Sequence, residues 1–283
     1  MMQLEGSLDI TTACQLAQVS RAGFYRDYND HEPRHMETAL RDALQRIALE
    51  NRFYGYRRVA AELRQQGWVV NHKRVLRIMR EDNLLSLRKQ RWVLTTESRH
   101  PYGVFPNLTQ DLKITAINQV WVSDITYIRL REGFVYLAVV LDAFSRRVLG
   151  WAIGETLEAG LAVTALDRAL EGRSIPSGVI HHSDQGVQYA SKVYVERLLA
   201  HGFRISMSRK AAPWENARAE SFMKTLKAEE VQLRQYRDLE EARNSMAHFL
   251  DHVYNGKRLH SALGYLSPAA FEAQLTAVPE STL

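Results

Sequence analysis

Three carboxylates in this chain of 283 residues have a spacing that suits a shared metal site. Asp124 and Asp184 each follow an apolar stretch typical of a β-strand, and Glu220 lies in a stretch, residues 216–227, that indicates a helix. Hard divalent cations take oxygen ligands. Two such ions about 3.5–4 Å apart can stabilise both the attacking and the leaving oxygen of a phosphodiester. The three acids therefore predict metal-dependent phosphoryl transfer.

Each acid alone also has an ordinary structural explanation. Asp124 at the end of a strand can cap a turn, and Asp184 before Gln185-Gly186 fits a common Asp-containing turn. Glu220 alone would be a helix-surface residue. A carboxylate that points off a central strand is nevertheless costly to bury unless it is paired or bound to metal. The combination of all three, with 35 residues between Asp184 and Glu220, favours metal binding.

Four other residues near the acids could have a functional or a structural role. We exclude zinc at His181 and His182, because adjacent strand residues point to opposite faces and no Cys-x-x-Cys set accompanies them. Asp142 is a fourth acid, which we assign to a turn after a strand. Trp214, in the loop before the Glu220 helix, can stack on an unpaired base or anchor in the core, and the sequence leaves both open.

Positive charge is concentrated in one stretch of the chain. The net charge is +5 overall, whereas residues 51–99 carry 12 lysines and arginines against four acidic residues, a net +8. Such a concentration is typical of proteins that bind a phosphate backbone. The cations of this stretch that we assign to DNA binding are Arg57, Arg58, Lys73, Arg74, Arg77 and Arg80.

The last four of these cations belong to a predicted recognition-like helix. Gly67 ends the helix before it and Asn71 caps it, and it extends to about residue 83. Its apolar side chains suit a core, while its cations lie three to four positions apart on the other side, as a recognition helix requires. An ordinary solvated helix face remains the alternative.

The residues around the three acids resemble the catalytic blocks of the DDE transposases. The blocks are Trp121-Val-Ser-Asp124-Ile-Thr-Tyr127, His181-His-Ser-Asp184-Gln-Gly-Val-Gln-Tyr189 and Asn216-Ala-Arg-Ala-Glu220-Ser-Phe-Met-Lys-Thr-Leu-Lys227. Further matches are Tyr54-Gly-Tyr-Arg-Arg-Val59 and residues 254–268. Within these transposases, the chain is most similar to the OrfB products of bacterial insertion sequences that express OrfA and OrfB through frameshifting.

The resemblance implies an α/β, RNase H-like catalytic core with a mixed five-stranded sheet, a fold shared with retroviral integrases. It implies that Asp124, Asp184 and Glu220 hold two Mg²⁺ or Mn²⁺ ions, and that Lys227 contacts a terminal DNA phosphate, with Lys224 nearby. The implied partners are double-stranded DNA, as terminal inverted repeats and as target, and OrfA or a fusion to it. A homo-oligomer assembled on DNA and copying through a circular intermediate are also implied.

The expected domain order has helices before and after the catalytic core. It runs as a small helix-turn-helix at 1–30, a helical DNA-binding domain at 31–87, a basic linker at 88–110, the catalytic core at 111–227 and a C-terminal helical extension at 228–283. Expected core elements are strands at 119–124, 133–141, 147–153, 178–182 and 203–207 and helices at 157–170 and 191–201.

The single cysteine, Cys14, excludes an internal disulfide framework, and we expect its side chain to be buried. No stretch reaches eighteen apolar residues, so no membrane segment is expected. We therefore expect a bacterial cytoplasmic, nucleoid-associated protein.

Two other function classes remain open beside the transposase. The first is a non-catalytic, accessory DNA-binding partner, since the chain has no leucine zipper of the kind that OrfA supplies. The second is an RNase H-like nuclease that cuts without joining. The intact acids argue against the first alternative, and the basic helical region argues mildly against the second.

Overall fold

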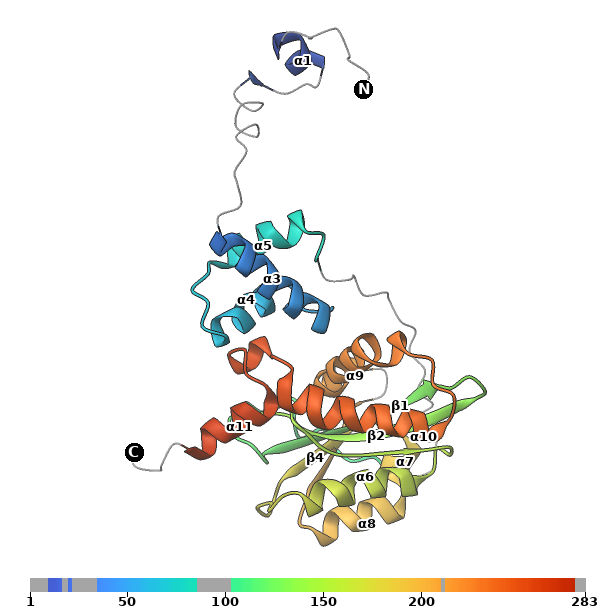
Figure 1. Ribbon diagram of the computed structural model, residues 1–283. Helices are drawn as coiled ribbons and strands as arrows, with labels where there is room; N and C mark the ends of the chain where they lie inside the picture. Colours follow the sequence, from blue (N-terminus) through green and yellow to red (C-terminus); the bar gives the residue numbers. More distant parts are fainter. Residues whose placement is uncertain (1–9, 17–19, 22–34, 86–102, 210–211, 278–283) are drawn as a thin grey trace.

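The computed structural model describes residues 10–16, 20–21, 35–85, 103–209 and 212–277 (Figure 1). Helix α1 (Ile10–Leu16) holds Cys14 with 4% of its surface exposed, which confirms the expected burial. Most of the second helix expected near the N-terminus, and much of the basic linker at 88–110, lie outside the described residues. No helix in the described ranges has the length and apolar character needed to cross a membrane.

Helices α3 (His35–Glu50), α4 (Tyr56–Gln65) and α5 (His72–Glu81) form a small domain around a shared apolar core. The side chain of Asn71 accepts a hydrogen bond from the Lys73 amide at 2.9 Å, so the predicted N-cap of α5 is confirmed. The apolar residues of this stretch predict a helical stripe made of Met36, Leu40, Leu44, Ile47 and Leu49. That prediction is wrong for Leu49, which is 64% exposed, because a residue two positions after Ile47 faces another side of the helix.

A mixed five-stranded sheet in the order β3-β2-β1-β4-β5 confirms the fold expected of the core. Its strands are β1 (Val120–Arg129), β2 (Phe134–Asp142), β3 (Val148–Gly154), β4 (Ile180–Ser183) and β5 (Arg204–Met207). The first three form an antiparallel meander, and β4 and β5 run parallel to β1. The expected end of the first strand at Asp124 is wrong, because β1 stays paired with β2 as far as Arg129.

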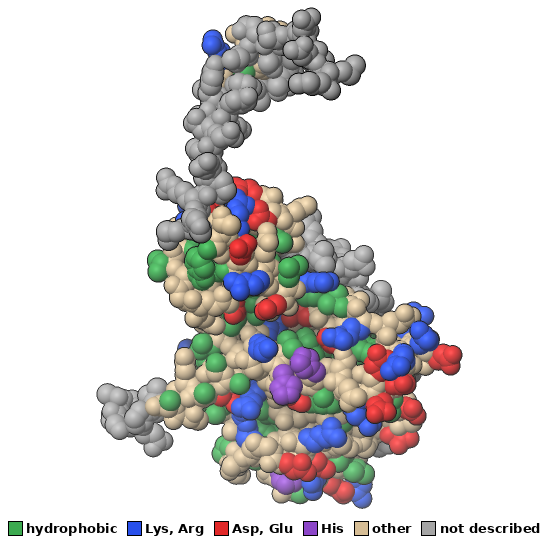
Figure 2. Space-filling model, in the orientation of Figure 1, with side chains coloured by type: hydrophobic (Ala, Val, Ile, Leu, Met, Phe, Trp, Pro, Cys, Tyr) green, Lys and Arg blue, Asp and Glu red, His purple; other side chains and the backbone are tan. Residues whose placement is uncertain are grey.

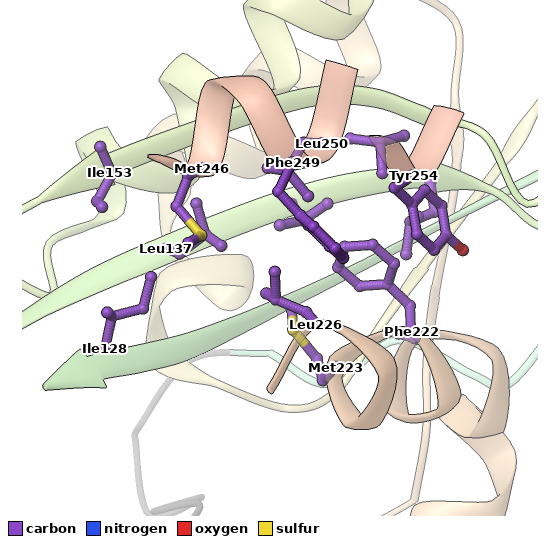
Figure 3. Close-up of a cluster of buried hydrophobic side chains, with 14 of the residues drawn as sticks. Ile128, Leu137, Ile153, Phe222, Met223, Leu226, Met246, Phe249, Leu250 and Tyr254 are labelled. Atoms are coloured by element: carbon purple, nitrogen blue, oxygen red, sulfur yellow. The ribbon is translucent and has the colours of Figure 1, made fainter. Parts of the chain in front are cut away.

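Helices cover both faces of the sheet (Figure 1). One face packs against α6 (Ala159–Glu171), α7 (Val187–Ala190) and α8 (Lys192–Ala200). The other packs against α9 (Ala217–Glu229), α10 (Leu239–Ala247) and the π-helical segment η3 (His248–Lys257). Figure 3 shows Met223 and Leu226 of α9 pointing into the same cluster as Met246 and Phe249 from the helical segments on the other side of the view. The C-terminal helices therefore share the core of the sheet.

The helical domain rests on the segment that follows η3 (Figure 1). Leu259 is buried in the same apolar cluster as α3, α4 and α5, and its amide donates a hydrogen bond to the Tyr54 hydroxyl at 2.9 Å. The Gln65 side chain donates to the Tyr265 carbonyl at 3.0 Å. Helix α11 (Pro268–Ala277) completes the chain beyond this contact.

Close packing between β3 and α6 depends on Gly150. A Cβ at this position would lie 2.3 Å from the Ala165 carbonyl oxygen and 2.5 Å from the Ala169 amide nitrogen. Both contacts are with helix backbone, which cannot move aside as a flexible side chain would. The absence of a side chain at Gly150 therefore sets the distance between this helix and the sheet.

We expect Gly150→Ala to lower the free energy of unfolding by about 1–3 kcal/mol or more, because overpacking forces the backbone to shift. Gly160→Ala, in the helix α6 that packs against Gly150, is the matched control, since nothing lies within 4 Å of its added Cβ. It should be neutral or slightly stabilising. Urea unfolding measures both variants, and equal stability of the two would contradict the packing described here.

Candidate active site

The parallel register of β1 and β4 places Asp124 and Asp184 opposite each other. Val122 pairs with His182 at the last paired position. Two residues further along each segment lie Asp124, within β1, and Asp184, directly after the end of β4. Residues at matching positions of neighbouring parallel strands point to the same side, and such strands lie about 4.8 Å apart. The two carboxylates therefore meet where the strands separate.

Glu220 comes to the same place from α9. Val122 and Ile128 of β1 face the cluster that contains Ala219 and Leu226 of α9, and Asp124 shares their side of the strand by alternation. Glu220 stands next to Ala219, at the edge of this contact. In the structure its carboxylate pairs with Lys224, with Nζ 3.3 Å from Oε2.

The electrostatics of Asp124 reflect both neighbours. Burial, together with the charges of Asp184 and Glu220, raises the pKa of Asp124 to about 8, although a hydrogen bond from the Ile125 amide and the charge of Lys227 oppose the rise. A carboxyl with such a pKa stays largely protonated at neutral pH unless a cation stabilises its charge. The structure therefore brings the three acids into one electrostatic site.

The three carboxylates lie in one region but are not close enough together to ligate one metal ion. Among the described residues no three His, Cys, Asp or Glu side chains stand close enough to hold a metal ion between them. Asp184 accepts a hydrogen bond from the Gly186 amide at 2.9 Å, and Glu220 is engaged by Lys224. The donor set, three carboxylates with one strongly desolvated, fits a hard divalent ion such as Mg²⁺ or Mn²⁺.

Lys227 faces the acids, whereas Lys224 is held by Glu220. The Lys227 ammonium lies over the Tyr127 ring, 4.9 Å from its centroid. Burial lowers the pKa of Lys227 and the charge of Asp124 raises it, so the two groups are near each other. Tyr127 belongs to the first motif, but its position beneath Lys227 could not be read from the sequence.

Two further buried polar groups at the site lack a partner. The Tyr189 hydroxyl has no hydrogen bond, and burial, with smaller effects of the charges of Asp124 and Asp184, raises the pKa of its phenol well above the ordinary value. The Asn216 amide nitrogen lies 3.4 Å from the Ser123 carbonyl, and its side-chain oxygen is unpartnered. Tyr189 ends the second catalytic block and Asn216 begins the third, and only this position in the blocks could have identified them from the sequence.

The two histidines make separate hydrogen bonds. His181 Nε2 contacts the hydroxyls of Ser123 and Tyr194 at 2.8 and 2.9 Å, whereas His182 Nδ1 contacts Ser206 at 2.8 Å. Both rings are buried, and burial lowers the pKa of His181 to about 3 and that of His182 to about 4. They are neutral core groups.

The other two uncertain residues have contrasting positions. Asp142 accepts hydrogen bonds from the backbone amides of Asn118, Phe144 and Ser145, which fixes the turn after β2. Trp214 is 69% exposed, so it does not anchor the core.

Outside the acid site, the α5 cations lie on its solvent side, opposite the buried Val75, Ile78 and Met79. They are not equally free. Arg74 and Arg77 pair with Glu37 at 3.4 and 3.1 Å, while Lys73 and Arg80 form no ion pair within the described part of the chain. Figure 2 shows acidic and basic side chains interspersed on the visible face of this domain. The cationic face of α5 is thus partly neutralised by α3.

The two α4 arginines point in different directions. Arg57 is exposed, with its guanidinium over the Tyr56 ring at 5.6 Å. Arg58 is half-buried over the Tyr54 ring and lines a cavity beside α9. The two therefore do not contribute to one surface.

Comparison with known proteins gives matches along most of the chain. Models of the integrase core domain match residues 115–213 and 201–268, and a model of an HTH-like domain matches residues 36–92. The 31 kDa protein of insertion element IS600 from Shigella sonnei is 37% identical over 267 residues, which span 91% of this chain and 96% of that protein. The transposase InsF for insertion sequence IS3A from Escherichia coli is 34% identical over 277 residues, or 95% of each chain.

Among solved structures, an integrase intasome of simian T-cell lymphotropic virus, in complex with PP2A regulatory subunit B56 gamma, aligns with a TM-score of 0.47 and 15% identity. The alignment covers 85% of this chain and 76% of that chain. The sequence relatives are far closer and extend over both the helical domain and the sheet. On their evidence, this chain belongs to the insertion-sequence transposases of the DDE/integrase superfamily.

Proposed function

We propose that this DNA transposase cleaves insertion-sequence ends and joins them to target DNA with two divalent ions held by Asp124, Asp184 and Glu220. The observation that carries the proposal is the opposition of Asp124 and Asp184 across the β1–β4 register, with α9 alongside. When bound, Mg²⁺ or Mn²⁺ would stabilise the attacking and leaving oxygens of a phosphodiester. Water or a DNA 3′-hydroxyl would then attack the phosphodiester directly, without a covalent enzyme–DNA intermediate.

The chain's own residues supply position and charge. The sheet fixes the two aspartates, and the packing of Phe222 and Leu226 fixes the helix that carries Glu220. Lys227, held over Tyr127 beside the acids, is placed to contact a DNA phosphate near the scissile bond. Lys224, which pairs with Glu220 in the structure, would be available to DNA if Glu220 held a metal ion instead.

Two alternatives compete with this proposal. A purely accessory DNA-binding role leaves the desolvated carboxyl of Asp124 beside two other acids without a purpose. A nuclease that cuts without joining would use the same acids, so only a joining assay distinguishes it. The relatives named as transposases favour the joining enzyme.

We further propose that α3–α5 hold the terminal inverted repeats, that OrfA or a fusion to it assists, and that several copies assemble on DNA. The support is the HTH-like match and the solvent-facing cations of α5. We also propose, as the resemblance implies, that the protein acts at the bacterial nucleoid. The proposed domain limits stay at 30, 87, 110 and 227, with the C-terminal helices packed on the core.

Asp184→Asn and Glu220→Gln should each lower end cleavage and joining by more than about 100-fold in Mg²⁺, since even an indirect supporting group of a metal site contributes 10–100-fold. Binding of end DNA should persist. Asp167→Asn, which breaks only a surface pair with Arg197, is the control and should keep full activity. Cleavage and joining of labelled paired ends, with and without an OrfA fusion, provide the measurement. Unchanged activity in both variants, or full activity in excess chelator, would refute the metal mechanism.

Glu37→Gln should strengthen DNA binding, because it releases Arg74 from its ion pair and leaves Arg77 paired with Glu81 alone, at 2.7 Å. The slope of log affinity against log salt should steepen by about 1 for each arginine that reaches a phosphate. Glu50→Gln removes the same charge from an exposed position of α3 and serves as the control. Anisotropy titrations at several salt concentrations measure both variants. If the two strengthen binding equally, net charge rather than α5 explains the effect.

A further inference from the structure

A cavity of about 200 Å³ lies between the helical domain, α9 and the C-terminal segment. Figure 1 shows these three parts meeting above the sheet. Four arginines from separate parts of the chain line it: Arg58 of α4, Arg146 in the turn after β2, Arg218 of α9, and Arg258 after η3. The imidazole of His260 also lines the cavity. The folded chain therefore gathers four guanidinium groups that are far apart in sequence.

The positive charge in this cavity is poorly compensated. Arg258 makes a two-pronged pair with Glu229, with both N–O distances 2.7 Å. Arg58, Arg146 and Arg218 form no ion pair within the described ranges. Burial lowers the pKa of His260, and the charges of Arg258, Arg146 and Arg58 lower it further, so that it falls to about 2. The imidazole is therefore neutral beside a cluster of like charges.

Asp142 also lines the cavity, but its carboxylate does not neutralise it. Its side chain is 0% exposed. Its oxygens accept hydrogen bonds from the backbone amides of Asn118, Phe144 and Ser145 at 2.7–2.9 Å. The carboxylate is thus engaged by three backbone amides and by Arg173, whose Nη1 lies 3.7 Å from Oδ2. The other polar groups of the lining include the four guanidinium groups and the hydroxyls of Ser221 and Ser261.

The backbone of this turn presents Arg146 in an uncommon conformation. Its φ is +62°, in the left-handed region that arginine seldom adopts. An arginine held there by the surrounding structure is a reason to look for a function. The turn places its side chain at the cavity.

The cavity is separate from the acid site although both use α9. With about 3.6 residues per helical turn, Arg218, Ser221 and Thr225 share one side of the helix. Glu220 and Lys224 follow a different side, and the latter pair is engaged with each other. A ligand in the cavity would therefore contact α9 from behind the carboxylates.

We propose that this cavity binds a phosphate group through Arg58, Arg146, Arg218 and Arg258. Guanidinium groups suit phosphate because their N–H donors pair with its oxygens in a forked geometry. The phosphate is either a backbone phosphodiester of bound DNA or a free phosphate ion. The DNA source rests on the proposed function, whereas binding of a free ion does not. A phosphate here would tie the helical domain to α9 and the C-terminal segment.

The first arm of the test measures thermal unfolding in chelator, with inorganic phosphate compared against chloride at equal ionic strength. Phosphate should raise the melting temperature of the unchanged chain by about 2–4 °C at a concentration well above the dissociation constant. Arg146→Gln and Arg218→Gln should lose this response. Both should also melt no lower than the unchanged chain without phosphate, since each removes an uncompensated charge. Arg204→Gln, an exposed arginine of β5, is the matched control.

The second arm titrates DNA at several salt concentrations with the same proteins. If the salt slope decreases by about 1 for Arg146→Gln or Arg218→Gln, and by more than for Arg204→Gln, the phosphate belongs to DNA. A phosphate response that depends on these arginines, with unchanged DNA slopes, supports a free-ion site instead. If neither phosphate stabilisation nor the DNA slope distinguishes the two variants from Arg204→Gln, the proposal is overturned. Loss of cleavage activity plays no part in this result.

Discussion

The parallel pairing of β1 with β4 is the interaction on which the active site depends. Because Val122 pairs with His182, the chain delivers Asp124 and Asp184 to matching positions of adjacent strands. A slip of one residue would turn one aspartate to the opposite face of the sheet and separate the pair. Trp121 and Ile180, buried on opposite faces, hold this register in place.

Helix α9 converts that strand pair into a three-acid site. Its apolar side is buried in the cluster with Ile128, Leu137 and Phe249, which fixes the helix against β1 (Figure 3). Glu220 stands at the edge of this contact. On another side of the same helix, Arg218 faces the arginine-lined cavity. One helix thus forms a shared wall between an acidic site and a basic site, so movement of α9 would affect both.

Local sequence pattern was sufficient to predict much of this architecture. The cap at Asn71 and the apolar side of α5 follow from capping and helical spacing, which are properties of neighbouring residues, whereas the mixed sheet was implied by the family resemblance. The length of β1 beyond Asp124 did not follow, because it depends on pairing with β2. The exposure of Leu49 likewise depends on how α3 packs against its neighbours.

In the candidate site, too, some features could be predicted from the sequence and others could not. The acids could be identified from their motifs, but the engagement of Glu220 by Lys224 and the support of Lys227 by Tyr127 depend on side-chain contacts. The pairing of α5 arginines with Glu37 joins two helices. The arginine cavity is the extreme case, since its members come from four separate segments and no local pattern connects them.

Asp124, crowded by Asp184 and Glu220, stays largely protonated at neutral pH unless a cation stabilises its charge. Its pKa is raised from 3.8 to about 8, so the folded chain keeps a proton that the unfolded chain releases. Without metal, the free energy of unfolding should therefore fall as pH rises from about 4 towards 8, and it should stay low above that range. Asp124→Asn removes this contribution.

The most direct measurement is the free energy of unfolding of the unchanged chain and of Asp124→Asn at pH 5.5 and pH 8, in chelator and in Mg²⁺. We predict that in chelator the unchanged chain loses more stability than the variant between the two pH values. Mg²⁺ at pH 8 should restore the unchanged chain and have little effect on the variant. Identical pH dependence and identical responses to Mg²⁺ in the two proteins would contradict the account.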